Sequence, residues 1–84
     1  MVTLLYFASL RETLGISSEK VVLPVGASTV SALVDVLRAR GEGWSHALAA
    51  GKPWRVAVNQ QMAAASTAIK AGDEIAFFPP VTGG

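Results

Sequence analysis

The sequence contains no cysteine and few charged residues, and both features limit the kinds of site and fold that it can form. Without cysteine there is no disulfide, no thiolate metal site and no cysteine nucleophile. Charged residues make up 15% of the 84 residues, against about 25% in typical domains, whereas hydrophobic residues make up 51%. This composition excludes disorder and predicts one small globular domain. Because so little polar material is available to cover it, we expect part of its surface to serve a partner.

The sequence also lacks the signals of nucleic-acid binding, membrane insertion and secretion. The seven basic residues are scattered and the net charge is +1, so no basic patch for nucleic acid is predicted. No apolar run approaches the roughly 18–20 residues of a membrane span. Residues 1–5 lack the basic start of a signal peptide. We expect a cytoplasmic protein.

Side chains that could perform catalysis or bind a metal are few. The single histidine, His46, lies among the hydrophobic residues of segment 44–48, a setting typical of a structural histidine. The six carboxylates show no metal-ligand spacing. Asp73 and Glu74 are adjacent, so in a strand they would point to opposite faces. The sequence therefore predicts neither a side-chain active site nor a metal site.

The first half of the chain predicts two strands and a helix. Residues 2–8 are predicted to form a strand with Val2, Leu4 and Tyr6 on one face. A short helical turn is expected over 9–15 and a second strand over 19–24. The two strands would then form an antiparallel hairpin with a wide loop. A helix then begins at Ser28 as N-cap and ends at Gly41 as C-cap. Its apolar stripe is Val30, Leu33, Val34 and Leu37, and a shorter helix follows around 44–48.

The second half is mostly strand. Residues 54–58 alternate, with Trp54, Val56 and Val58 inward and Arg55 and Ala57 outward. A turn at 59–60 leads to a very short strand at Met62, and a turn at 72–73 leads to a strand over 74–78. The order of elements predicts an α+β fold of β-grasp (ubiquitin-like) type, with a mixed sheet packed on one main helix.

The C-terminal segment has its own character. Pro79 and Pro80 cannot donate ladder hydrogen bonds, so the last strand must end and the chain continue extended. The five residues 80–84 reach about 17 Å when extended, and the two final glycines are thin enough to thread into a narrow channel. We therefore divide the chain into a β-grasp domain over 1–79 and an extended tail over 80–84.

Three segments carry a family resemblance. They read FASLRE over residues 7–12, AVNQ over 57–60 and GDEIAFFPPVTGG over 72–84. Together they resemble the molybdopterin synthase small subunit, a family of MoaD-like sulfur carriers. The resemblance spans nearly the whole chain in order and length, and only the stretch from about 42 to 53 carries no family motif.

The resemblance implies a chemistry of the C-terminal carboxylate. In the family, an adenylating enzyme (MoeB-like) uses Mg-ATP to turn the terminal glycine, here Gly84, into an acyl-adenylate, and sulfur displaces AMP to leave a thiocarboxylate. The tail, here Pro80, Val81, Thr82 and Gly83, then inserts into the synthase large subunit (MoaE-like). There, cyclic pyranopterin monophosphate (precursor Z) receives the sulfur for the molybdopterin dithiolene. The usual assembly is a heterotetramer, and the small subunit binds no cofactor or metal itself.

Outward-facing apolar residues give an independent indication of partner binding. Phe7 and Phe78 lie where solvent is expected, on the first and last strands, which are neighbours in a β-grasp sheet. Met62 on the short strand extends the same surface. We expect these three residues to dock both the large subunit and the adenylating enzyme, since each must receive the same tail.

Three other functions are consistent with parts of the sequence. A sulfur carrier of another pathway, such as thiazole synthesis, shares the fold and the Gly-Gly end. A ubiquitin-type modifier would form isopeptide bonds with target lysines. A plain β-grasp interaction module would have an inert tail, and deleting Gly83 and Gly84 would change nothing.

Overall fold

The structure, a computed structural model, describes residues 1–49 and 54–79 of the chain. In chain order, the elements are β1 (Val2–Tyr6), α1 (Ala8–Leu14), β2 (Ser18–Val21), α2 (Val30–Arg38), α3 (Glu42–Ala47), β3 (Arg55–Val58), β4 (Gln61–Met62) and β5 (Glu74–Phe78). No helix within the described ranges is long and apolar enough to cross a bilayer.

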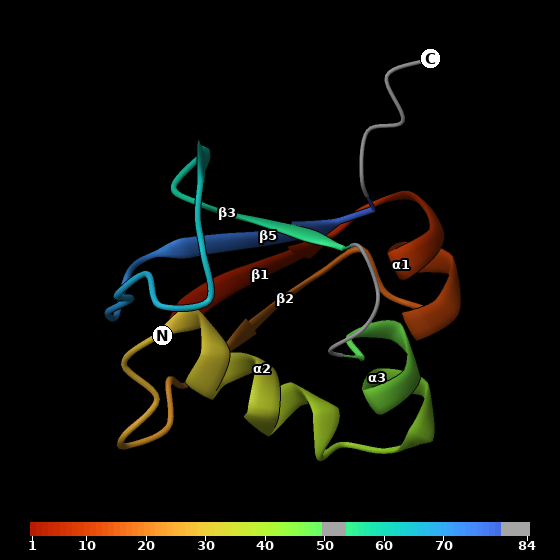
Figure 1. The fold of residues 1–84 in the computed structure, drawn as a ribbon, viewed down its shortest axis with the longest axis horizontal. Helices are drawn as coiled ribbons and strands as arrows, with labels where there is room; N and C mark the ends of the chain where they lie inside the picture. Colours follow the sequence, from red (N-terminus) through yellow and green to blue (C-terminus); the bar gives the residue numbers. More distant parts are fainter. Residues whose placement is uncertain (50–53, 80–84) are drawn as a thin grey trace.

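The strands form one mixed sheet in the order β2-β1-β5-β3-β4. The first and last strands, β1 and β5, run parallel at its centre, and every other neighbouring pair is antiparallel. Helices α2 and α3 lie together against one face, and α1 lies at the end of the sheet where β1 finishes (Figure 1). This arrangement confirms the predicted β-grasp fold.

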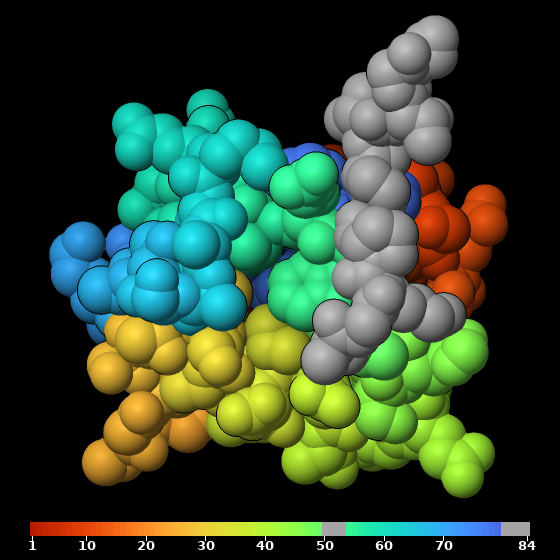
Figure 2. All heavy atoms as spheres, viewed as in Figure 1, coloured from red at the N-terminus to blue at the C-terminus, as the bar shows by residue number. Residues whose placement is uncertain are grey.

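The segment between β4 and β5 closes the layer of helices at one side. It packs against the start of α2 (cyan on yellow in Figure 2). The backbone N–H groups of Val30 and Ser31 donate to the carbonyls of Thr67 and Ala65, at 3.0 and 2.9 Å. Because these are first-turn donors with no partner inside the helix, the crossing segment satisfies groups that would otherwise be left unpaired.

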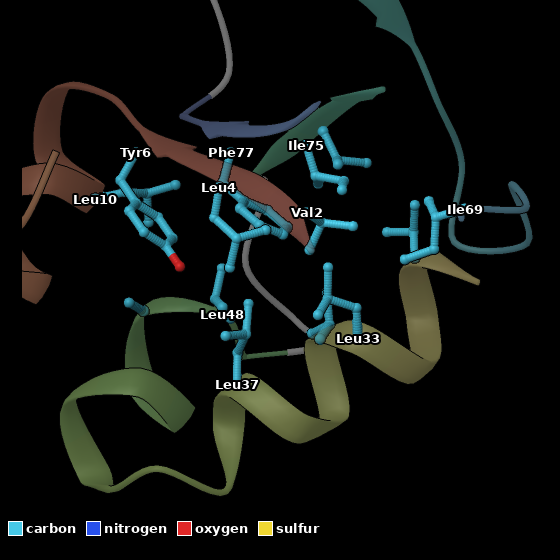
Figure 3. Packing of buried hydrophobic residues seen from close by; sticks show 14 residues of the cluster. Val2, Leu4, Tyr6, Leu10, Leu33, Leu37, Leu48, Ile69, Ile75 and Phe77 are labelled. Atoms are coloured by element: carbon cyan, nitrogen blue, oxygen red, sulfur yellow. The ribbon is translucent and has the colours of Figure 1, made fainter. Parts of the chain in front are cut away.

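The core lies between the sheet and the helices (Figure 3). Alternate residues of β1 and β5 point into it, and Leu33 and Leu37 of α2 meet them from below together with Leu48. The predicted α2 stripe is confirmed, since all four of its residues are buried. The strand alternation is confirmed for β1 and β5. Ala57 differs: it faces outward but is only 9% exposed.

Several predicted boundaries are wrong by one or more residues, each for a local reason. The first strand ends at Tyr6 because Ala8 turns the chain with a positive φ of 52°. The N-cap of α2 is Thr29, whose Oγ1 accepts from the N–H of Ala32 at 3.2 Å, rather than Ser28. The C-cap is Ala39, and Gly41 instead begins α3 as its N-cap, with φ 155°.

Candidate functional site

The outer face of the sheet, away from the helices, is organised in rows set by strand register. The middle row crosses the whole sheet from Ser18 through Leu5, Ala76 and Ala57 to Met62. Directly paired residues project from the same face, so this row is one almost uninterrupted apolar stripe. The sequence predicted that Met62 faces outward but not that two alanines would join it to the first strand.

The row at the end where the chain leaves β5 contains the two phenylalanines. Phe78 pairs with Arg55 of β3, and Phe7 follows the Tyr6–Phe77 pair, its N–H donating to the Phe77 carbonyl at 3.1 Å. Phe7 therefore lies beside β5 although it belongs to no strand: it is the extended N-cap of α1. Phe7 thus follows directly after the residue paired with Phe77, as Phe78 follows Phe77 itself.

We call the two rows together the outer patch, made up of Leu5, Phe7, Ala57, Met62, Ala76 and Phe78. Phe7 is 46% exposed and Met62 is 66% exposed, whereas Phe78 is half-buried. Ala57 is paired with Met62 on one side and with Ala76 on the other, and its own side chain is only a methyl group, so little of it reaches solvent. The middle row of the patch therefore carries two alanines, with the larger side chains of Leu5 and Met62 on either side.

Aromatic packing beneath the outer patch fixes the end of β5. The rings of Tyr6 and Phe77 stack with centroids 5.8 Å apart, and Trp54 meets Phe77 edge-on at 6.0 Å. Trp44 of α3 meets Tyr6 edge-on at 5.5 Å. Such pairs add about 0.5–1.5 kcal/mol beyond the burial of their area. Because Phe77 is held on the inner face, Phe78 is held on the outer one.

A polar network that the sequence did not predict supports the same end of the sheet. The Tyr6 hydroxyl donates to Glu19 Oε2 at 2.8 Å, and Arg40 Nη1 donates to the same oxygen at 2.7 Å. Arg40 also lies over the Trp44 ring, 4.5 Å from its centroid. Burial acts to raise the pKa of Glu19, but the hydrogen bonds from Arg40 and Tyr6 outweigh it, so the pKa is lowered. Burial, reinforced by Glu19, raises the pKa of Tyr6.

A second network lies at the opposite end of the outer face, where β5 begins. Asp73 is 5% exposed and accepts hydrogen bonds from Asn59 Nδ2 at 3.0 Å and from the Lys70 N–H at 2.9 Å. The Oδ1 of Asn59 in turn accepts a hydrogen bond from the backbone N–H of Glu74 at 3.0 Å. The bonds from Asn59 and Lys70 lower the pKa of Asp73. Asn59 and Gln60 both have positive φ, 51° and 69°, and together they form the turn of the β3–β4 hairpin. Asn59 therefore shapes this turn and also anchors the start of β5.

The structure places the other candidate residues as follows. His46 lies in the last turn of α3, on the far side of the core from the outer patch. No group of three potential metal ligands occurs in the part of the chain that the structure describes. Residues 80–84, which include Gly84 and the predicted inserting segment, lie outside the described residues.

Comparison with known proteins gives full-length matches. Curated relatives named molybdopterin synthase sulfur carrier subunit are 43% identical in Haemophilus influenzae and 40% identical in Escherichia coli, each over 84 residues and 100% of both chains. Among solved structures, small archaeal modifier protein 1 (SAMP1) of Haloferax volcanii has 33% identity and a TM-score of 0.73, covering 99% of this chain and 98% of that one.

A second solved structure is a protein–protein complex of subunits 1 and 2 of the molybdopterin-converting factor of Helicobacter pylori. Its matching chain has 25% identity and a TM-score of 0.66, covering 99% of this chain and 97% of that one. The ThiS family matches residues 4–84. The chain belongs to the ThiS family, and the relatives that align over its full length are sulfur carrier subunits.

Proposed function

We propose that this chain is the sulfur-carrying small subunit of a molybdopterin synthase. The observation that carries the proposal is the 43% identity, over the full length of both chains, to a relative of that name. The tail sequence FFPPVTGG and the β-grasp fold support it. The protein is a sulfurtransferase only as part of the complex, with no side-chain active site of its own.

The proposed chemistry takes place at Gly84. A carboxylate is a resonance-stabilised anion and a poor electrophile, so an adenylating enzyme first joins it to AMP, releasing pyrophosphate from Mg-ATP. A sulfur nucleophile at the oxidation level of sulfide then displaces AMP and leaves a thiocarboxylate. A thioacid is more acidic than a thiol, whose pKa is about 8.5 in free cysteine, so the terminal sulfur is anionic and nucleophilic at neutral pH. In the large subunit this sulfur attacks cyclic pyranopterin monophosphate and joins Gly84 to the pterin through an acyl–sulfur bond. Water then cleaves that bond, so the sulfur stays on the pterin and the Gly84 carboxylate is restored.

The outer patch is the proposed docking surface for both proteins that receive the tail. Its two phenylalanines lie at the end of the sheet from which residues 80–84 continue. Phe7 and Met62 are exposed to a degree unusual for large apolar side chains. The complex of the two Helicobacter pylori subunits supports a large-subunit partner for this chain. Pro80, Val81, Thr82 and Gly83 would then enter the partner without bulky side chains.

Mass spectrometry of the chain, purified from cells that also express the adenylating enzyme, tests the carrier role. Oxidation of Met1 or Met62 changes the intact mass almost as much as replacing oxygen by sulfur. Trypsin, however, releases residues 71–84 as a peptide without methionine or cysteine. We expect sulfur in that peptide, alkylated by iodoacetamide, and absent when Gly84 is deleted. An unmodified peptide, in a preparation where the adenylating enzyme is active, would overturn the proposal in favour of an inert interaction module.

A protein modifier is the second candidate, favoured by the 33% identity to small archaeal modifier protein 1. It predicts branched peptides in which the Gly84 carboxyl is joined to a lysine side chain of another protein. The same digest distinguishes the two functions, because free thiocarboxylate and isopeptide-linked peptide differ in mass. Branched peptides without free thiocarboxylate would replace the synthase assignment with a modifier.

A further inference from the structure

The outer face carries its charge unevenly along the strand direction. The row at the start of β5 contains both Lys20 and Glu74, which flank Thr3 on either side. The row at the opposite end, next to the tail, contains Arg55 opposite Phe78 and no carboxylate. Positive charge at the tail end is therefore uncompensated within its row, whereas the charges of the other row balance.

Arg55 is exposed and makes no ion pair or side-chain hydrogen bond with any residue that the structure describes. This contrasts with Arg40 and Lys70, which are paired with Glu19 and Asp73. Cross-strand neighbours have Cβ atoms about 4.5–5.5 Å apart, so the Arg55 stem stands beside Phe78. A guanidinium at the end of such a stem reaches the border of the outer patch while staying in water.

Any protein that covers Phe78 must also meet Arg55. Covering a guanidinium without giving it an acceptor is costly, because its hydration is lost and nothing replaces it. A carboxylate is the acceptor that suits it best, since its two oxygens match the planar fork of the guanidinium. Apolar contacts at Phe7 and Phe78 then form the centre of the interface, and the charge pair forms its rim.

We infer that the synthase large subunit binds the tail end of the outer patch with an acidic group placed against Arg55. This inference rests on the proposed function and adds the chemistry of the partner surface. The pair fixes orientation: the partner's acidic border lies on the β3 side of Phe78, at the end where the tail leaves. Lys20 lies at the other end of the face, where Thr3 separates it from Glu74, and takes no part in the pair.

Charge reversal at two positions of the same face tests the inference. Arg55→Glu and Lys20→Glu change the net charge equally, and both residues are exposed on the outer face. The affinity of each variant for the purified large subunit is measured by titration calorimetry at low salt and at about 1 M salt, where the Debye length falls to about 3 Å. Thermal unfolding of both variants checks that the fold is kept.

We expect Arg55→Glu to raise the Kd at low salt by at least about tenfold, corresponding to about 1.4 kcal/mol. The loss should shrink at high salt, and Arg55→Lys should recover part of the affinity by restoring the charge. Lys20→Glu should change the Kd by less than about threefold, as rim charges far from a contact do. Equal effects of the two reversals, or a loss at Arg55 that is independent of salt, would overturn the inference.

Three further outcomes distinguish a failure of this inference from a failure of the proposed function. If Phe78→Glu abolishes binding while Arg55→Glu behaves like Lys20→Glu, the acidic partner surface is wrong and the synthase assignment stands. If Arg55→Glu weakens binding to the adenylating enzyme but not to the large subunit, the assignment to the large subunit is wrong. If the large subunit binds neither the parent chain nor any variant, the proposed function fails together with the inference.

Discussion

Phe77 and Phe78 are consecutive phenylalanines of β5, and they lie on opposite faces of the sheet in different surroundings. Phe77 has no exposed surface and stacks with Tyr6. Phe78 is half-buried on the outer face beside Arg55. The inner face is filled by large apolar side chains, whereas the middle of the outer face carries two alanines between larger neighbours. The same strand therefore stabilises the fold with one face and contributes to the proposed docking surface with the other.

The largest expected effect comes from emptying the inner face. Phe77→Ala removes a ring that contacts Tyr6 and Trp54, leaving a cavity where the sheet meets the helices. Truncations of this kind cost about 3–5 kcal/mol, a large part of the stability of an 84-residue domain. Urea unfolding followed by tryptophan fluorescence measures the loss. A change below about 1 kcal/mol would mean that the inner face does not carry the stability.

The matched change on the outer face should affect binding instead. Phe78→Glu places a charge in the apolar surface proposed for docking, so we expect the Kd for the large subunit to rise by at least about tenfold. Unfolding free energy should fall by about 1 kcal/mol or less, as for substitutions outside the core. Unchanged affinity in a calorimetric titration would remove Phe78 from the interface.

Acid should lower the stability of the fold by protonating two hydrogen-bonded carboxylates, Glu19 and Asp73. The folded-state pKa values of Glu19 and Asp73 are lowered, so the carboxylates stabilise the fold above their ordinary pKa values. That contribution is lost as the pH falls through the lowered values. We expect urea midpoints to decline below about pH 4.5 and to decline less in Asp73→Asn, which has one titrating group fewer. An equally steep decline in that variant would show that Asp73 is not responsible.

The smallest effect is expected at the far border of the outer patch. Met62 is 66% exposed on the edge strand β4, so Met62→Ala should change the unfolding free energy by less than about 0.5 kcal/mol. Lost apolar contact should raise the Kd for the large subunit severalfold, less than Phe78→Glu does. An effect on stability as large as that of Phe77→Ala would contradict the division between the two faces.

Local patterns were enough to predict much of this fold. Alternation in β1 and β5, the stripe of α2 and the left-handed Gly15 that ends α1 depend on neighbours in sequence, and each is confirmed. The N-cap of α2 was missed by one residue because Ser28 and Thr29 both offer a hydroxyl. Only the extended backbone of Thr29 and its bond to Ala32 decide between them.

Long-range polar contacts could not be predicted. Glu19 meets Tyr6 and Arg40 across separations of 13 and 21 residues, and neither partner has a spacing that signals the other. Predicting that Arg55 lies opposite Phe78 would have required the register of β3 against β5, which only the structure shows. By contrast, the exposure of Phe7 and Met62 followed from alternation and from the short hairpin at 59–60.

The central claim is that sulfur leaves Gly84 for the pterin, and a single-turnover transfer tests it most directly. The thiocarboxylated chain is mixed with the large subunit and cyclic pyranopterin monophosphate. The tryptic peptide 71–84 is then followed by mass spectrometry, while molybdopterin is measured in the same sample. The account predicts that the peptide returns to the carboxylate form as molybdopterin appears, and more slowly with Phe78→Glu. Molybdopterin formation while the peptide keeps its sulfur, or loss of sulfur without molybdopterin, would contradict it.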